Sequence, residues 1–316
     1  MSTPDQTPEP VPAPFSATFA AAIPPVDTRV TYPAGGVASA GVVLLAQVVE
    51  GRLLVVLDET AVHPVDATWP DQPADHGTLT IGGAELPIVD AVVGATDGET
   101  VFVGAHVPVK KGTEGWGFLV VHVLEAPEPT AANAALVPGA AAHVSVDAEL
   151  RRALSFGHTA CHLASLALNA ALAPTWKKET APDALGRPDF DGLAIERSRI
   201  GPFGSVDRYR IGKSLRRKGF DPASLDDPSS LTDQVDATLA AWVASDGAAR
   251  IDAPGDTLTA RRTWHCELPD GIAELPCGGT HVDGLASIGT VSVALETATV
   301  DGALLLTMRT SVVPRG

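Results

Sequence analysis

Apolar residues in the first third of the chain occur in short runs that are separated by polar turns. Gly41–Val49 and Arg52–Leu57 are two such runs, both rich in Val and Leu, and Asp90 and Asp97 mark turns further along. Short, evenly spaced runs of this kind are typical of a small β-barrel. We therefore expect a β-barrel domain over residues 26–127.

The hydrophobic pattern changes to a helical period after residue 145. From Val146 to Leu172 apolar positions recur about every 3.6 residues, with Asp147 placed to cap the helix and Pro174 to end it. A second apolar stripe predicts a helix over Leu231–Ser245. Strand-like runs follow the first helix and flank the second, at 248–252, 257–267, 287–297 and 302–310. The chain is thus predicted to be α+β, with a C-terminal α/β domain over residues 146–316 whose helices pack on an antiparallel sheet.

Composition separates two further segments from these domains. Residues 1–25 are rich in Pro, Ala, Ser and Thr with little charge, which predicts a disordered arm, and residues 128–145 read as a Pro- and Ala-rich linker. The full length of 316 residues is enough for two compact domains, and a hydrophobic content of 45% is enough for two cores.

Nothing in the composition indicates a membrane protein or an exported one. No stretch approaches the ~20 uninterrupted apolar residues of a membrane helix, and the first ten residues lack the basic and apolar regions of a secretion signal. The three cysteines are an odd number, which argues against a disulfide framework. We expect a cytoplasmic protein without a membrane partner.

Two separate motifs supply the chemistry of a zinc site. His158 and His162 lie one turn apart on the same face of the predicted helix, and Cys277 and His281 are joined by a Gly-rich turn that lets the backbone fold tightly. Three imidazoles and one thiolate form a usual ligand set for four-coordinate zinc. Either pair alone could instead be made of hydrogen-bonded core residues.

The same motifs resemble a known family. The segment Cys277-Gly-Gly-Thr-His281-Val, together with the upstream His158-x-x-x-His162 helix, closely resembles the editing domain of alanyl-tRNA synthetase and its free-standing relatives, the AlaX-type trans-editing proteins. It is more distantly similar to the editing domain of threonyl-tRNA synthetase. Leu57–Pro64 and Gln72–Leu79 look like the two flanks of the family's glycine-rich loop, so the resemblance covers roughly residues 35–310.

The resemblance implies an activity and a set of site residues. The activity would be hydrolysis of the ester that joins an amino acid to the terminal ribose of tRNA, with zinc held by His158, His162, Cys277 and His281. The zinc ion would polarise the ester and activate water, or would only orient the substrate, since four protein ligands usually make a closed structural site. The residues expected to act on the substrate are Gln72 and Thr280 as catalytic groups, and Thr60, His63, Gly278 and Gly279 as substrate contacts, the turn amides serving as oxyanion donors.

The chain departs from the family between the two flanks. Val65–Asp71 replaces a run of glycines with bulkier residues, His63 stands where the family has an aromatic residue, and Ser287 replaces an acidic residue. The expected cargo is a mischarged small or β-hydroxy amino acid, such as serine on alanine tRNA or a threonine analogue such as fluorothreonine. Two alternatives remain: a zinc-stabilised RNA-binding or scaffold protein without catalysis, and a metal hydrolase of small molecules.

The charge is distributed unevenly. The net charge is -16, yet eleven of the twenty-two Lys and Arg residues lie between Lys177 and Lys218, within a predicted insertion over residues 177–220. A basic segment on an acidic body would direct a polyanion to one surface. We therefore expect tRNA to bind there, through Lys213, Arg216, Arg217 and Lys218. The alternative is a solvated, salt-bridged surface segment.

Overall fold

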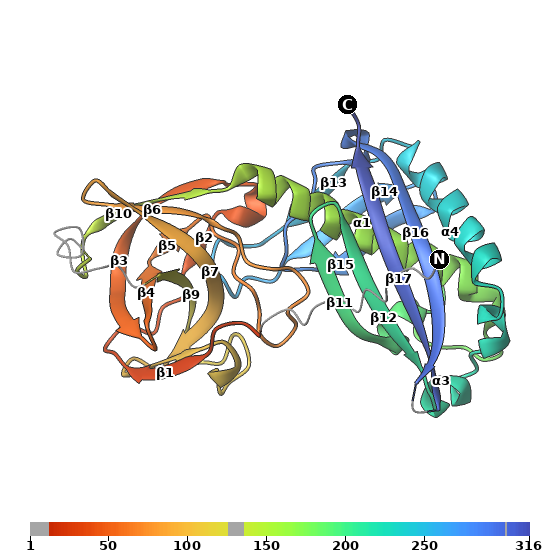
Figure 1. Ribbon diagram of the computed structural model, residues 1–316, viewed down its shortest axis with the longest axis horizontal. Helices are drawn as coiled ribbons and strands as arrows, with labels where there is room; N and C mark the ends of the chain where they lie inside the picture. Colours follow the sequence, from red (N-terminus) through yellow and green to blue (C-terminus); the bar gives the residue numbers. More distant parts are fainter. Residues whose placement is uncertain (1–12, 126–135, 301) are drawn as a thin grey trace, which may run out of the picture.

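The computed structural model describes residues 13–125, 136–300 and 302–316, and its chain is α+β with mostly antiparallel sheets. Figure 1 shows an N-terminal sheet structure and a C-terminal structure of helices and sheets side by side, with helix α1 extending from one into the other. None of the helices in these ranges is long and apolar enough to cross a bilayer.

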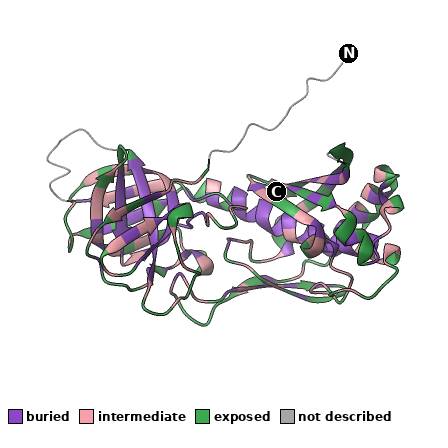
Figure 2. Ribbon diagram, turned by 90° about the horizontal axis from the view of Figure 1, so that it is seen from below, coloured by how far each residue is buried: buried purple, intermediate pink, exposed green. Residues whose placement is uncertain are grey.

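The N-terminal part is one eight-stranded antiparallel sheet in the order β1-β8-β7-β6-β10-β3-β4-β9, in which β7 also pairs with β9. The hydrogen-bonded pairings therefore return on themselves through β7, β6, β10, β3, β4 and β9. The alternating Val and Leu side chains of these strands fill one apolar core, and Figure 2 shows the buried residues on the strands of this part. The bounds of the sheet's strands are β1 Ala17–Ala20, β3 Ala38–Val49, β4 Arg52–Leu57, β6 Gly77–Ile81, β7 Ala84–Thr96, β8 Thr100–Val103, β9 Gly117–Glu125 and β10 Ala141–Val146.

Short elements complete the N-terminal part. Strands β2 (Arg29–Val30) and β5 (Glu59–Thr60) pair in parallel, and the 3₁₀ turns η1 (Tyr32–Ala34) and η2 (Gly104–His106) follow β2 and β8. Tyr32 of η1 is only 3% exposed and reaches the junction with the C-terminal part.

The C-terminal part is organised around α1 (Ala148–Leu172). The carboxylate of Asp147 accepts hydrogen bonds from the amides of Glu149 (3.1 Å) and Leu150 (2.9 Å), so the predicted N-cap is confirmed, and the helix ends before Pro174 as expected. Helix α4 (Pro228–Val243) begins three residues earlier than predicted. Both helices pack on a four-stranded antiparallel sheet, β11-β12-β17-β16, and a three-stranded sheet, β13-β14-β15, completes the core.

The strands of these two sheets are β11 Ile195–Gly201, β12 Gly204–Ile211, β13 Ala249–Asp252, β14 Thr263–Leu268, β15 Gly271–Pro276, β16 Ile288–Val300 and β17 Ala303–Pro314. The short helices are α2 Phe190–Ala194 and α3 Lys213–Arg217, and the 3₁₀ turns are η4 Ala173–Thr175, η5 Pro222–Leu225 and η6 Leu285–Ser287. The run expected at 257–267 forms a strand only from Thr263, and β15 was not predicted.

A buried ion pair joins the loop before β6 to α1. Arg151 donates from Nε to Asp75 Oδ1 at 2.8 Å and from a terminal nitrogen to Asp75 Oδ2, and both side chains are almost fully buried. The same guanidinium donates to the carbonyls of Gly36 (3.1 Å) and Ala61 (2.8 Å). Because a buried charge without its partner is costly, this pair fixes the loop over residues 61–76 against the helix that carries His158 and His162.

Three expected segment boundaries were wrong in the described residues. Ala17–Ala20, assigned by composition to a disordered arm, forms β1 and pairs with β8, whereas residues 1–12 lie outside the described ranges. Ala141–Val146 was placed mostly in the linker but pairs with β3 and β6, and residues 126–135 lie outside the described ranges. The basic segment 177–220 is no insertion, because β12 within it pairs with β17 along its whole length.

Candidate metal centre and active-site cavity

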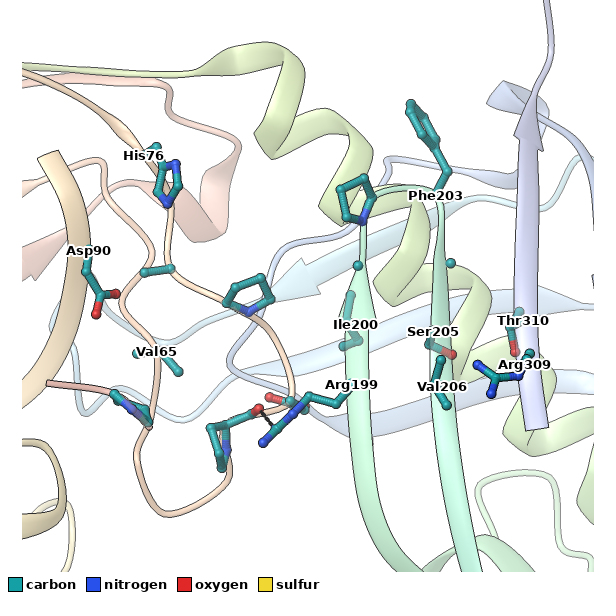
Figure 3. Close-up of a pocket in the computed structure, with 18 of the residues that line it drawn as sticks. Val65, His76, Asp90, Arg199, Ile200, Phe203, Ser205, Val206, Arg309 and Thr310 are labelled. Atoms are coloured by element: carbon teal, nitrogen blue, oxygen red, sulfur yellow. Dashed lines mark hydrogen bonds between the residues drawn. The ribbon is translucent and has the colours of Figure 1, made fainter. Parts of the chain in front are cut away.

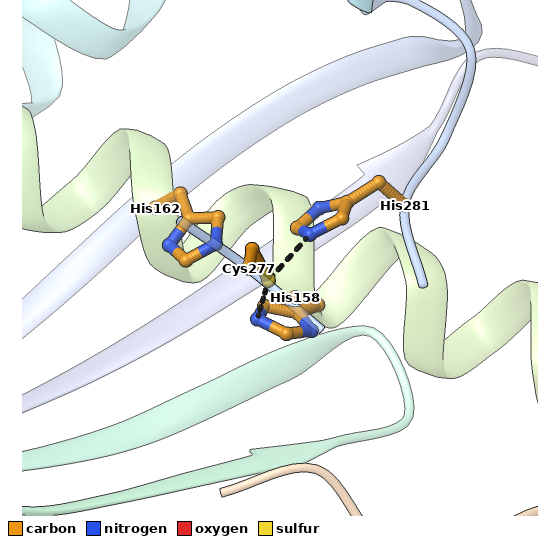
Figure 4. Close-up of side chains that lie close together, drawn as sticks. All are labelled: His158, His162, Cys277 and His281. Atoms are coloured by element: carbon orange, nitrogen blue, oxygen red, sulfur yellow. Dashed lines mark hydrogen bonds between the residues drawn. The ribbon is translucent and has the colours of Figure 1, made fainter. Parts of the chain in front are cut away.

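The four predicted metal ligands come together in one cluster. His158 and His162 project from one face of α1, Cys277 follows the end of β15, and His281 follows the Gly278-Gly279 turn. One donor atom of each of the four side chains lies within 4.8 Å of the others. Cys277 Sγ is 3.4 Å from His158 Nε2 and 3.2 Å from His281 Nε2, and Figure 4 shows the thiol between these rings.

The donor set fits a metal ion. His162 Nε2 is buried and has no hydrogen-bond partner among the described residues, an arrangement that a bound cation would satisfy. Burial lowers the pKa of His162 to about 4 and holds the pKa values of His158 and His281 well below the usual range, so all three imidazoles are in the neutral, ligating form at neutral pH. Burial also raises the pKa of the Cys277 thiol to about 12, and a coordinated cation reverses that preference by deprotonating the thiol. Three nitrogens and one sulfur suit zinc.

Hydrogen bonds outside the cluster orient two of its imidazoles. Gln72 Oε1 lies 2.7 Å from His158 Nδ1 and can only accept, so Nδ1–H donates and Nε2 faces the cluster. His281 Nδ1 lies 3.1 Å from Thr159 Oγ1, which also accepts from the amide of Val282 at 3.2 Å. Partners of this kind fix the tautomer and the ring orientation of metal-binding histidines.

A cavity of about 310 Å³ lies beside the cluster and is lined by His158, His162 and Cys277. Four of the residues predicted to act on the substrate also line it: His63, Gln72, Gly278 and Gly279. His63 is 6% exposed and packs edge-on against Tyr32, with ring centroids 5.1 Å apart. Its Nδ1 has no hydrogen-bond partner in the described part of the chain, and burial lowers its pKa to about 4. The cavity therefore has a neutral imidazole facing the ligands from the N-terminal part.

Gln72 and Thr280 form a closed hydrogen-bonded pair. Gln72 Nε2 donates to Thr280 Oγ1 at 2.9 Å, and the Thr280 amide donates to Gln72 Oε1 at 3.0 Å. Ser155 Oγ also donates to Thr280 Oγ1 at 2.9 Å. Thr280 lines a second cavity, of about 720 Å³, on the His281 side of the cluster. The structure thus brings both predicted catalytic residues to the cluster, where their polar atoms hold His158 and the turn.

The turn amides have unequal hydrogen-bonding states. The Gly279 amide approaches Cys277 Sγ at 3.4 Å, and the Thr280 amide is taken by Gln72. A Cβ on Gly279 would lie 2.6 Å from Gln72 Oε1 and closer still to the His158 ring, whereas a Cβ on Gly278 would meet nothing within 4 Å. Gly279 is therefore the position where the turn approaches the ligands too closely for any side chain.

Five predicted contact residues lie away from the cavity. Thr60 is fully buried, and its hydroxyl is 2.9 Å from His122 Nε2 inside the N-terminal part. It does not line either cavity beside the cluster. The same holds for the four basic residues in and directly after α3, which Figure 1 places at the end of the four-stranded sheet where β16 turns into β17: Lys213, Arg216, Arg217 and Lys218.

Several residues of the site were not identified from the sequence. Tyr32, Trp69 and Arg262 line the cavity beside the cluster. Arg262 is 7% exposed and donates to Tyr32 Oη at 3.3 Å and to the Thr257 carbonyl at 2.8 Å. No local pattern marks these three residues, because they come from separate loops. Thr159, by contrast, lies on the ligand face of α1 and could have been found from the helical period.

Comparison with known proteins relates the chain to part of a larger enzyme. No protein-family model matches. The chain is 26% identical over 264 residues to alanine–tRNA ligase of Chlorobaculum tepidum, covering 81% of this chain and 25% of that protein. Alanine–tRNA ligases of Akkermansia muciniphila (26% identical, 79% and 22% covered) and Kineococcus radiotolerans (29%, 79% and 23%) are also similar. The chain spans about a quarter of the length of the curated relatives it matches.

Proposed function

We propose that this protein is a zinc-dependent aminoacyl-tRNA deacylase of the AlaX type, which hydrolyses the ester between a mischarged amino acid and its tRNA. The observation that carries the proposal is the meeting of His158, His162, Cys277 and His281 beside a cavity, in a chain most of which is similar to part of alanine–tRNA ligase. The cyclic strand pairing around β7 and β9 supports the expected small β-barrel as the N-terminal part.

Zinc bound by this cluster would supply a Lewis acid for the ester carbonyl. The protein's own residues would do the rest. Gln72 orients His158 and ties it to the turn through Thr280, so we assign Gln72 and Thr280 to positioning within the catalytic unit. The Gly278 amide remains as the turn's candidate oxyanion donor, since those of Gly279 and Thr280 face Cys277 and Gln72.

The cargo we propose is a small or β-hydroxy amino acid, with serine and threonine analogues as the first candidates. A cavity of about 310 Å³ is at the lower end for ligand pockets, which fits a short side chain. His63 and its unpartnered Nδ1 offer one polar contact to a hydroxyl. The loop over Val65–Asp71, which carries Trp69 and Asp71 to the cavity wall, would narrow the choice further.

The test is release of amino acid from a panel of charged tRNAs by the zinc-loaded protein: Ser-, Ala- and Gly-tRNA beside Thr- and fluorothreonyl-tRNA. We expect selective release from one or two of them, abolished by Cys277→Ala. Cys161→Ala is the matched control, because Cys161 is also on the C-terminal side but its thiol lies 3.5 Å from Asp207, outside the cluster. Equal loss in both variants would show that folding, and not the cluster, was disturbed.

A metal-stabilised RNA-binding protein without catalysis is the second candidate. It is favoured by the four side chains themselves, because zinc sites with four protein ligands are usually structural. This candidate predicts tRNA binding and a metal-dependent fold, with no release of amino acid from any member of the panel. Cleavage of small esters without tRNA would instead support a small-molecule hydrolase.

A further inference from the structure

The hairpin of β11 and β12 keeps two like charges directly opposite each other. Arg197 and Arg208 are cross-strand partners, and both are exposed. Like charges in this position are destabilising. The burden is retained in a chain with a net charge of -16, which has acidic residues to spare for neutralising them. Such a pair indicates that an anion is bound there from outside.

The positive charge extends along the face of the sheet that is turned away from α1. Arg199, Val206 and Arg309 form the neighbouring cross-strand row, and Arg210 follows Arg208 on the same face. Two glutamates share this face, Glu196 at 3.5 Å from Arg208 and Glu296 on the far strand, opposite Thr307. Asp207, between the arginines in sequence, is 2% exposed and points to the other side. The face therefore carries five arginines against two acids: Arg197, Arg199, Arg208, Arg210 and Arg309.

A groove connects this face with the metal cluster. A cavity of about 450 Å³ is bounded by Arg197, Arg199 and Arg208 on one side and by the loop with Trp69 and Asp71 on the other. Trp69 and Asp71 also line the 310 Å³ cavity beside the cluster. A third cavity, of about 750 Å³, continues over the row of Arg199 and Arg309, and Figure 3 shows these side chains facing His76 and Asp90 of the N-terminal part.

Trp69 stands where the two smaller cavities meet. Its side chain is 46% exposed, which is unusual for the largest apolar residue. An exposed aromatic ring between arginines is the combination that holds single-stranded nucleic acid, because the ring stacks on a base of any sequence while the guanidinium groups hold the phosphates. No acidic peptide would need the ring.

We infer that this groove binds the single-stranded 3′ end of the RNA substrate, with a base stacked on Trp69 and the adjacent phosphates on Arg197 and Arg208. The inference rests on the proposed function and names its substrate-binding surface. It follows from continuity: an ester at the end of an RNA strand can enter the cavity of Cys277 only if the next nucleotides lie in the space that adjoins that cavity. The groove meets this condition, and α3 with its basic residues does not border the cavity.

The test is binding of uncharged tRNA, labelled with a fluorophore at its 5′ end, measured by anisotropy between 50 and 200 mM salt. Arg197→Gln with Arg208→Gln should lower the slope of log Kd against log salt by roughly 1.4, about 0.7 for each single-strand phosphate. Trp69→Ala should weaken binding roughly tenfold, and Trp69→Phe should restore most of it. Arg216→Gln with Arg217→Gln on α3 removes the same charge elsewhere and should leave the slope unchanged.

Several results would overturn the inference. One is a lower slope in the α3 variant with an unchanged slope in the Arg197 and Arg208 variant. A second is wild-type affinity in Trp69→Ala, and a third is displacement of the tRNA by polyglutamate as readily as by single-stranded RNA, which would assign the face to an acidic protein. If the wild type deacylates tRNA while these variants behave as the wild type does, only the surface is refuted. If the wild type neither binds nor deacylates tRNA, the proposed function is refuted as well.

Discussion

Replacing Gly279 with alanine should damage the metal centre without touching a ligand. The added Cβ would lie 2.6 Å from Gln72 Oε1 and closer still to His158 Cε1 and Nδ1, whereas ordinary contact begins near 3.4 Å. The His158 ring, the Gln72 amide or the turn must therefore shift by roughly 1 Å, at a cost of about 1–3 kcal/mol for overpacking. The hydrogen bond between His158 and Gln72 would be lost or stretched, so zinc affinity should fall about 10–100-fold, as for other losses of a partner outside a metal's ligands.

Gly278→Ala is the matched control for this prediction. The two glycines are adjacent, neither has a positive φ, and a Cβ on Gly278 meets nothing within 4 Å. Both substitutions change the unfolded chain in the same way, so their difference reports the native contact alone. Zinc affinity is measured by competition with a chromophoric chelator, and thermal unfolding is followed with and without zinc. Equal zinc affinity in the two variants would refute the argument that the turn is packed against His158.

Three further perturbations have definite expected results. Gln72→Ala should lower zinc affinity about 10–100-fold in the same competition assay, because His158 loses its acceptor; an unchanged affinity would show that packing alone orients the ring. His122 is fully buried with its pKa lowered to about 4, so the unfolded chain binds a proton first as the pH falls from 6.5; stability is complete above pH 6.5, and about 3 kcal/mol is lost by pH 4. The free energy of unfolding of His122→Gln, measured over this range, should be flatter than that of the wild type by that amount, and parallel curves would contradict the assignment. Asp75→Asn should reduce stability by about 3–5 kcal/mol, because it leaves the buried Arg151 guanidinium without a counter-charge; a fall in Tm of only one or two degrees would mean that the guanidinium finds another partner.

Local chemistry in the sequence determined the metal ligands and the main helix. His158 and His162 are four residues apart, and Cys277 and His281 are four residues apart, so each pair is set by the period of a helix or the tightness of a turn. The Asp147 cap and the end of α1 before Pro174 were confirmed for the same reason, since a cap acts within three residues. The α+β class followed from the change of hydrophobic period along the chain.

Only the tertiary structure decided what surrounds the ligands and where charge gathers. Gln72 holds His158 across 86 residues of sequence, and Thr60 turns to His122 instead of the cavity, because long-range packing decides which face of a short strand is turned to a site. The basic segment looked like an insertion with its charge at Lys213 to Lys218. Its strand β12 instead pairs with β17, about a hundred residues later, and this pairing brings Arg309 into line with Arg199. Residue spacing records neighbours along the chain, whereas the register between distant strands depends on the whole core.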